Sequence, residues 1–186
     1  MDQKKPLTKR APQIEAGDRA RLGLAIYRKR PEVMSVIHIH PDWIVALTAC
    51  EKPLLPIYAA YSPAGLRLVL DGIPVYPRSI RITNRELAED FIKVMGEKKA
   101  CLLVGHGMTT AGGSVEEATV TSLHLYELAR VHGMAYAIGR PKPIPEADIF
   151  EYQKRTEGRD GPPRESSSRF ESDWRYHVKL LQKRGR

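Results

Sequence analysis

Three histidine side chains are placed so that they could bind one divalent metal ion. His38 and His40 end a strand-like apolar segment. Because side chains along a strand alternate between its two faces, both imidazoles point to the same side. His106 follows a second apolar run, 100–104, on a turn flanked by glycines. Three imidazole ligands with one open coordination position are typical of a catalytic zinc site.

The spacing therefore predicts a metal site where two strands leave the core. Zn²⁺ is the expected ion, with Mn²⁺ or Fe²⁺ as alternatives, because three histidines do not by themselves fix the metal. The other interpretation, separate histidines with structural or surface roles, stays open on spacing alone.

The elements that must position these histidines alternate between strands and helices. Strands or extended segments are expected over 33–40, 54–61, 66–70, 73–76 and 100–104, and a turn over 105–113. Helices are expected over 18–30 and 44–49, from the capping box Thr83–Glu86 to Gly96, and from Ser114 to Gly139. This mixture predicts an α/β domain built around one central sheet.

A length of 186 residues is enough for one domain and short for two. The basic, proline-containing segment 1–17 is expected to be disordered, and 18–150 to form the domain. Residues 151–186 are expected to form a linker and a helical tail, with the Gly-, Pro- and Ser-rich part at 154–168. Both cysteines, Cys50 and Cys101, have apolar neighbours and are expected to be buried thiols.

The formal net charge of +8 raises the question of nucleic-acid binding. Much of the excess lies at the two ends of the chain, and no nucleic-acid motif accompanies it. We therefore expect an anionic small-molecule substrate and no nucleic-acid partner. No apolar run reaches the roughly 18 residues of a membrane span, and no signal-peptide pattern is seen, so a cytoplasmic location without membrane association is expected.

The residues around the histidines resemble a known family. Residues 30–41 (RPEVMSVIHIHP), 103–108 (LVGHGM) and 112–118 (GGSVEEA) are similar to the metal-binding segments of the class II aldolase/adducin family. The resemblance covers roughly residues 18–139. It implies a single-domain α/β/α sandwich with a mostly antiparallel central sheet. It also implies a homotetramer with active sites between subunits.

The resemblance assigns His38, His40 and His106 as metal ligands and implies a divalent-metal-dependent carbon–carbon lyase. In this family the metal is a Lewis acid that stabilises the enediolate or enolate formed when a carbon–carbon bond breaks. Aldol cleavage, epimerisation and decarboxylation all pass through such a species, so the metal site alone does not choose among them.

Two features of the sequence narrow the substrate. The segments with which sugar-phosphate members hold phosphate have no counterpart here, and the matching segments are more similar to the decarboxylase branch. We expect a decarboxylase or aldolase acting on a non-phosphorylated, oxygenated carboxylic acid of the hydroxy, keto or aromatic type. The alternatives are an aldolase or epimerase of a small sugar-derived substrate, and a non-catalytic adducin-like interaction module.

The resemblance also indicates residues for proton transfer. Family enzymes carry an acid upstream of the first metal histidine, and Arg19 occupies the aligned position here. Asp18 beside it is the expected substitute, with Glu15 as the alternative. Tyr176 and His177, in the aromatic tail, are candidates for relaying a proton at a neighbouring subunit's site. Simple packing of the tail is the alternative for both.

Three further side chains are candidates for binding the substrate. Tyr58 and Tyr61 lie in a segment that resembles the family's strand near the metal, where an aromatic residue lines the pocket. Arg81 could pair with a substrate carboxylate. For each of them, an ordinary packed or surface role is the alternative interpretation.

Overall fold

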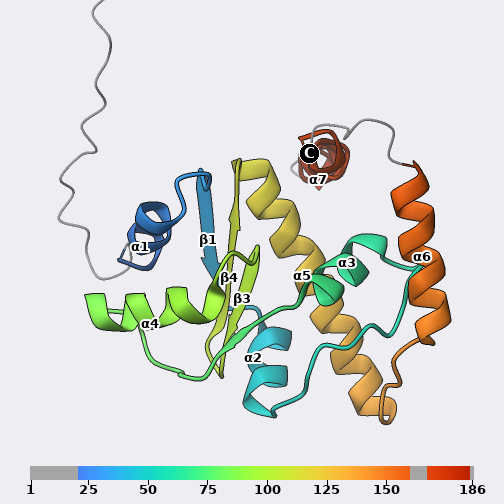
Figure 1. Ribbon diagram of the computed structural model, residues 1–186, viewed down its shortest axis with the longest axis horizontal. Helices are drawn as coiled ribbons and strands as arrows, with labels where there is room; N and C mark the ends of the chain where they lie inside the picture. The colour runs from blue at the N-terminus through green and yellow to red at the C-terminus, as the bar shows by residue number, and fades with distance from the viewer. Residues whose placement is uncertain (1–20, 160–166, 185–186) are drawn as a thin grey trace, which may run out of the picture.

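A four-stranded sheet forms the centre of the molecule in the computed structural model, which describes residues 21–159 and 167–184 (Figure 1). Its strands are β1 (Ser35–Ile39), β2 (Val75–Tyr76), β3 (Ala100–Leu103) and β4 (Gly107–Gly112), in the order β1-β4-β3-β2. β4 runs antiparallel to β1 and β3, whereas β2 is parallel to β3. The predicted α/β class with a mostly antiparallel sheet is thereby confirmed.

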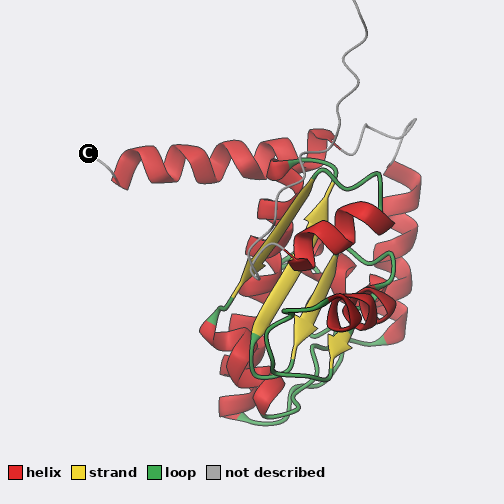
Figure 2. Ribbon diagram, turned by 90° about the vertical axis from the view of Figure 1, so that its left-hand side faces the viewer, coloured by secondary structure: helices red, strands yellow, loops and turns green. Residues whose placement is uncertain are grey.

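Helices cover both faces of this sheet (Figures 1 and 2). On one face lie α1 (Arg21–Lys29) and α4 (Arg85–Met95). On the other lie α2 (Asp42–Ala49) and the long α5 (Val115–Ile138), with α3 (Pro63–Asp71) against α5. The last two helices are α6 (Glu146–Arg159) and α7 (Ser167–Arg184), and α7 packs on α5. The layers form the expected α/β/α sandwich.

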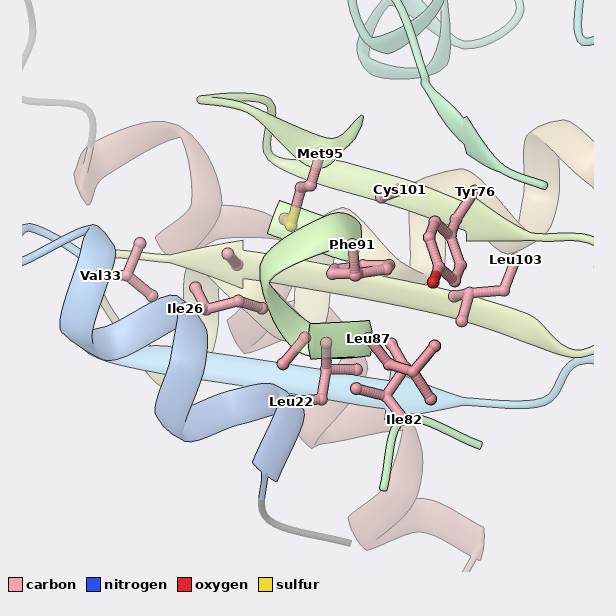
Figure 3. Packing of buried hydrophobic residues seen from close by; sticks show 12 residues of the cluster. Leu22, Ile26, Val33, Tyr76, Ile82, Leu87, Phe91, Met95, Cys101 and Leu103 are labelled. Carbon is pink, nitrogen blue, oxygen red and sulfur yellow. The ribbon is translucent and has the colours of Figure 1, made fainter. Parts of the chain in front are cut away.

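Strand alternation divides the core into two clusters. Cys101 and Leu103 face α1 and α4, where they pack with the fully buried Phe91 (Figure 3). Leu102 and Met108 face α2 and α5. The two central strands, β3 and β4, are therefore buried on both faces, whereas β1 and β2 at the edges are partly exposed.

The strand register then sets the direction of His38. His38 is paired with Thr109, and Thr109 is paired with Cys101 on the other side of β4. Because directly paired residues project to the same face, His38 lies on the side of the sheet that α1 and α4 cover.

Two of the predicted elements differ from the structure. Residues 66–70, expected to be extended, belong to α3, because Ser62 caps the helix by accepting a hydrogen bond from the Gly65 N–H (3.3 Å) and Pro63 favours the first helical position. Residues 107–112, expected to be part of a turn, form β4. Its sequence GMTTAG has few large apolar residues, yet every residue in it is buried.

Helix ends are closer to expectation. Ser114 caps α5 by accepting from the Glu117 N–H (3.1 Å), and the helix ends at Gly139, as predicted. α4 ends at Gly96 as predicted, but its cap is Asn84, whose side chain accepts from the Leu87 N–H, and not Thr83. The asparagine is one residue closer to the helix and reaches its third amide.

The carboxyl-terminal part is more helical than expected. α6 crosses position 150/151 and includes the first residues of the predicted linker, and α7 is 18 residues long. Tyr152 joins α6 to α3: its hydroxyl accepts from Arg67 (2.8 Å) and donates to the Pro63 carbonyl (3.0 Å). Cys101 is buried as expected, whereas Cys50 is exposed at the end of α2. Across 21–159 and 167–184, no helix combines the length and apolar character that a membrane crossing requires.

His132 gives the fold a predictable dependence on pH. Nδ1 of this fully buried imidazole lies 2.8 Å from the Leu128 carbonyl oxygen, and Nε2 lies 2.8 Å from the Leu55 N and 3.0 Å from the Leu55 carbonyl oxygen. In the neutral tautomer with a proton on Nδ1, the ring donates to Leu128 and accepts from the Leu55 N–H. Burial lowers its pKa below the ordinary value of 6.5. When the pH falls below 6.5, this histidine binds a proton in the unfolded chain but stays neutral in the folded chain. The free energy of unfolding therefore decreases as the pH falls.

We expect the free energy of unfolding to decrease between pH 7 and pH 5, and the decrease to be smaller in the His132→Gln variant. Urea unfolding at several pH values, with chelator present throughout so that bound metal does not vary, measures both slopes. Equal slopes would assign the pH dependence to other groups.

Candidate metal centre

The structure brings His38, His40 and His106 together. Each offers one ring nitrogen, and the three nitrogens lie within 4.8 Å of one another. The ring centroids are 4.9 Å apart for His38 and His40, 5.0 Å for His38 and His106, and 4.7 Å for His40 and His106. The predicted convergence of the three side chains is therefore present.

One nitrogen pair already has the spacing of two ligands on one ion. Nε2 of His38 and Nε2 of His40 are 3.1 Å apart. Two nitrogens that each lie about 2.1 Å from a zinc ion are separated by about 3.0 to 3.4 Å, depending on the ligand angle. This separation fits a shared divalent cation.

The sheet explains how residues so distant in sequence meet. Ile39 pairs with Met108, so the end of β1 lies beside the turn that joins β3 to β4 and carries His106. Gly105 begins this turn with a left-handed φ of 57°, which glycine adopts without strain. At Gly107 a Cβ atom would lie 2.3 Å from the Ile39 carbonyl oxygen and 3.1 Å from the His40 Cα. Only glycine permits this approach.

Thr109 orients the first of the imidazoles. Its Oγ1 lies 3.0 Å from Nδ1 of His38. With Nδ1–H donating to this hydroxyl, the lone pair on Nε2 is directed toward His40. In metal sites, a hydrogen bond to the ring nitrogen that does not bind the metal fixes the tautomer and the orientation of a histidine ligand.

The electrostatics of the cluster favour the neutral form of two of the imidazoles, His38 and His106. Burial lowers the pKa of His38 to about 4, with further contributions from the charges of His106 and His40. The pKa of His106 is also lowered, first by burial and then by the charges of His40 and Arg81. A neutral imidazole offers the lone pair that a metal ion requires.

His106 provides further evidence for an ion at this site, because one of its ring nitrogens has no partner among the described residues. Its Nδ1 is buried, and no group in the described part of the chain forms a hydrogen bond with it. A buried polar atom without a partner is costly unless an ion or another ligand binds it. Together with the spacing of the Nε2 atoms, this shows that the residues present fit a divalent metal ion.

Of the residues predicted to bind substrate, Arg81 is the one whose charge affects a histidine of the cluster, His106. It lies exposed in the segment between β2 and α4, and its positive charge is one cause of the lowered pKa of His106. Tyr58 and Tyr61 pack against each other (ring centroids 5.4 Å apart) on the side of α3 and α5. That is the opposite face from His38, so in this chain they do not join the cluster.

The predicted proton-transfer residues are not brought to the histidines either. Tyr176 and His177 lie on α7, with ring centroids 5.3 Å apart. α7 reaches the sheet where Lys99 stands over the Phe170 ring (5.1 Å), at the start of β3, whereas His106 follows the end of that strand. Figure 1 shows α7 at the end of the molecule opposite to the β3–β4 turn. Asp18 lies outside the described residues.

Two residues that support the ligands have no signal in the local sequence. Thr109 lies in the segment 105–113, for which the sequence predicts a turn, and Thr48, whose hydroxyl contacts Gly105, lies in no recognisable motif. Both contacts join residues more than fifty positions apart, 71 and 57 respectively. Only strand register and helix packing bring them together, and neither leaves a local signal.

Comparison with known proteins adds a family match. The family model described as Class II Aldolase and Adducin N-terminal domain matches residues 4–132. A 3,4-dihydroxyphthalate decarboxylase from Terrabacter is 37% identical over 129 residues, which cover 69% of this chain and 54% of that protein. An L-fuculose phosphate aldolase from Escherichia coli is 28% identical over 124 residues, covering 67% of this chain and 55% of that protein.

The fold has a counterpart among solved structures. An aldolase II superfamily protein from Pseudomonas syringae superposes with a TM-score of 0.72 at 20% identity, covering 89% of this chain and 63% of that one. At this identity the likeness concerns the fold. The chain spans about half the length of the curated relatives that it matches.

Proposed function

Because the chain belongs to the class II aldolase and adducin family, we propose that it is a divalent-metal-dependent carbon–carbon lyase. Its substrate is a non-phosphorylated, oxygenated carboxylic acid, and decarboxylation is the reaction. The observation that carries this proposal is the convergence of His38, His40 and His106, with two Nε2 atoms 3.1 Å apart and a buried, unpaired nitrogen on the third ring.

The choice of reaction is supported by the relatives. Identity is 37% to a decarboxylase of 3,4-dihydroxyphthalate and 28% to an aldolase of L-fuculose phosphate. A dihydroxylated aromatic carboxylate presents neighbouring oxygen atoms as well as a negative charge. It suits a site that combines three imidazoles with a nearby arginine.

The three imidazoles hold the ion, which we propose to be Zn²⁺, with Mn²⁺ or Fe²⁺ as alternatives. When bound, the ion stabilises negative charge on substrate oxygens as a Lewis acid. Thr109 keeps the His38 ring in the ligand orientation. Arg81 attracts the carboxylate and adds positive charge beside His106.

The reaction also requires a proton. When the bond to the carboxylate carbon breaks, carbon dioxide leaves, the electron pair stays on the remaining carbon, and a proton must be added there. We assign this transfer to Asp18, or to Tyr176 and His177 reaching the site of a neighbouring subunit. The assembly proposed is a homotetramer in the cytoplasm, without nucleic-acid or membrane partners.

The test is a product assay on protein reconstituted separately with Zn²⁺, Mn²⁺ and Fe²⁺. 3,4-Dihydroxyphthalate is expected to yield carbon dioxide and a dihydroxybenzoate, and chelator is expected to stop the reaction. L-Fuculose phosphate, offered in parallel, is expected to remain intact. Release of an aldehyde from it would favour the aldolase alternative. A protein that binds no metal and converts neither compound would favour the interaction module.

A further inference from the structure

The turn that carries His106 is attached to helix α2 by one buried hydroxyl. Oγ1 of Thr48, which is 6% exposed, accepts a hydrogen bond from the Gly105 N–H (3.0 Å). The same hydroxyl donates to the Ile44 carbonyl of its own helix (2.7 Å). Both of its roles are thus used, and the turn is tied to the last part of α2.

A second contact holds the same glycine from the other side. Oγ of Ser79, in the segment between β2 and α4, donates to the Gly105 carbonyl (3.4 Å). The next residue, His106, donates its own N–H to the Leu103 carbonyl (3.1 Å). Both polar groups of Gly105 are therefore bound, which fixes the backbone directly before the third histidine.

The three ligands differ in how firmly their backbone is held when the hydrogen bond between Thr48 and Gly105 is left out of account. His38 belongs to β1 and is fixed by pairing with β4. His40 follows the strand directly, and Pro41 then leads into α2. His106 lies on a turn between two strands and has no ladder partner of its own. Its position relative to the other two depends on what holds the turn.

α2 connects two of the ligands directly. The helix begins two residues after His40 and ends beside Gly105, where Thr48 makes its hydrogen bond. The position of His106 relative to His40 therefore depends on one helix of eight residues, which follows His40 and contacts Gly105. No contact between Thr48 and an imidazole is required.

We propose that Thr48 is a positioning residue of the metal centre: through Gly105 it sets His106 at the distance from His40 and His38 that binding of a divalent ion needs. This inference rests on the proposed function only in that the three histidines bind a metal. It concerns affinity and coordination geometry, so it can be tested without any substrate.

The test is a titration of metal-free protein with Co²⁺, followed by its visible absorption. Thr48→Val keeps the side-chain shape and removes the hydroxyl, and it is expected to weaken Co²⁺ binding roughly 10- to 100-fold and to change the absorption spectrum. Thr48→Ser restores the hydroxyl and is expected to bind within about threefold of the wild type.

Thr110→Val is the matched control. Thr110 is fully buried, and its hydroxyl is bonded to the Ala118 carbonyl (3.0 Å) and to Ser122 (2.6 Å), on the face toward α5. Its loss should lower thermal stability without changing Co²⁺ affinity. Ser79→Ala is a second variant. Because Ser79 is exposed, this substitution leaves the core unchanged, and it should weaken Co²⁺ binding severalfold.

Hydrogen exchange of the Gly105 amide in metal-free protein gives an independent measurement. The exchange is expected to be faster in Thr48→Val than in the wild type or in Thr110→Val. Unchanged exchange together with unchanged Co²⁺ affinity in Thr48→Val would overturn the inference. A wild-type protein that binds no Co²⁺ would contradict the proposed metal site, and the Gly105 exchange would then decide the attachment alone.

Discussion

Replacing His38 and His40 together by alanine is expected to leave the protein folded but unable to hold a divalent ion. One imidazole, His106, remains, and a single neutral nitrogen does not retain a metal against dilution or dialysis. The proposed lyase activity should fall by roughly a thousandfold or more, because the Lewis acid contributes several kcal/mol to the transition state. Metal analysis of the dialysed protein, beside the activity assay, measures both effects.

The His38→Ala, His40→Ala variant should keep the thermal midpoint of the metal-free wild type, since the paired strands and both core clusters remain in place. His124→Ala is the control for metal content: it removes an imidazole on α5 that faces Asp173 (3.3 Å) outside the cluster. If the double variant still carried one ion per chain, the metal would have to bind elsewhere and the assignment of the ligands would be wrong.

Gly107→Ala is expected to damage the fold and the metal centre at once. The new Cβ would lie 2.3 Å from the Ile39 carbonyl oxygen, and a backbone atom in a paired strand cannot turn away as a side chain can. The strand ends must separate, at a cost of about 3 kcal/mol, the upper part of the usual range for overpacking. For a chain of this size that cost corresponds to a fall of roughly 6 to 12 °C in the thermal midpoint.

Metal affinity should fall in the same variant, because the shift moves the backbone that carries His40 away from His106. Gly113→Ala, just beyond the other end of β4, is the matched control. There the nearest atom to a new Cβ is the carboxylate oxygen of Glu117 at 3.4 Å, an ordinary contact on a flexible side chain. Calorimetry and Co²⁺ titration of both variants make the comparison. Equal midpoints for the two would show that β1 and β4 do not approach as closely as described.

Much of the framework was predictable from local patterns. The alternation that places His38 and His40 on one side, the buried run before His106 and the capped helix that starts at Ser114 are all short-range signals, and the structure contains each of them. The convergence of the three imidazoles follows, because an antiparallel partner returns the chain to the end of β1.

The misassigned parts share a different cause. β4 has the composition of a turn, with two glycines and two threonines in six residues, and it is a strand because β1 and β3 supply partners on both sides. Thr48 and Thr109 act on the site across long stretches of chain, so their roles appear only when the layers are assembled. Local sequence predicts the ligands well and their supports poorly.

Helix α2 makes the metal centre sensitive to chain length. Each residue advances a helix by about 1.5 Å and turns it by about 100°. One residue inserted between His40 and Thr48 would rotate the Thr48 hydroxyl away from the Gly105 N–H. An insertion between α2 and α3 would leave the position of this hydroxyl on the helix unchanged. The metal centre therefore requires a fixed number of residues between His40 and Thr48, in addition to the three histidines themselves.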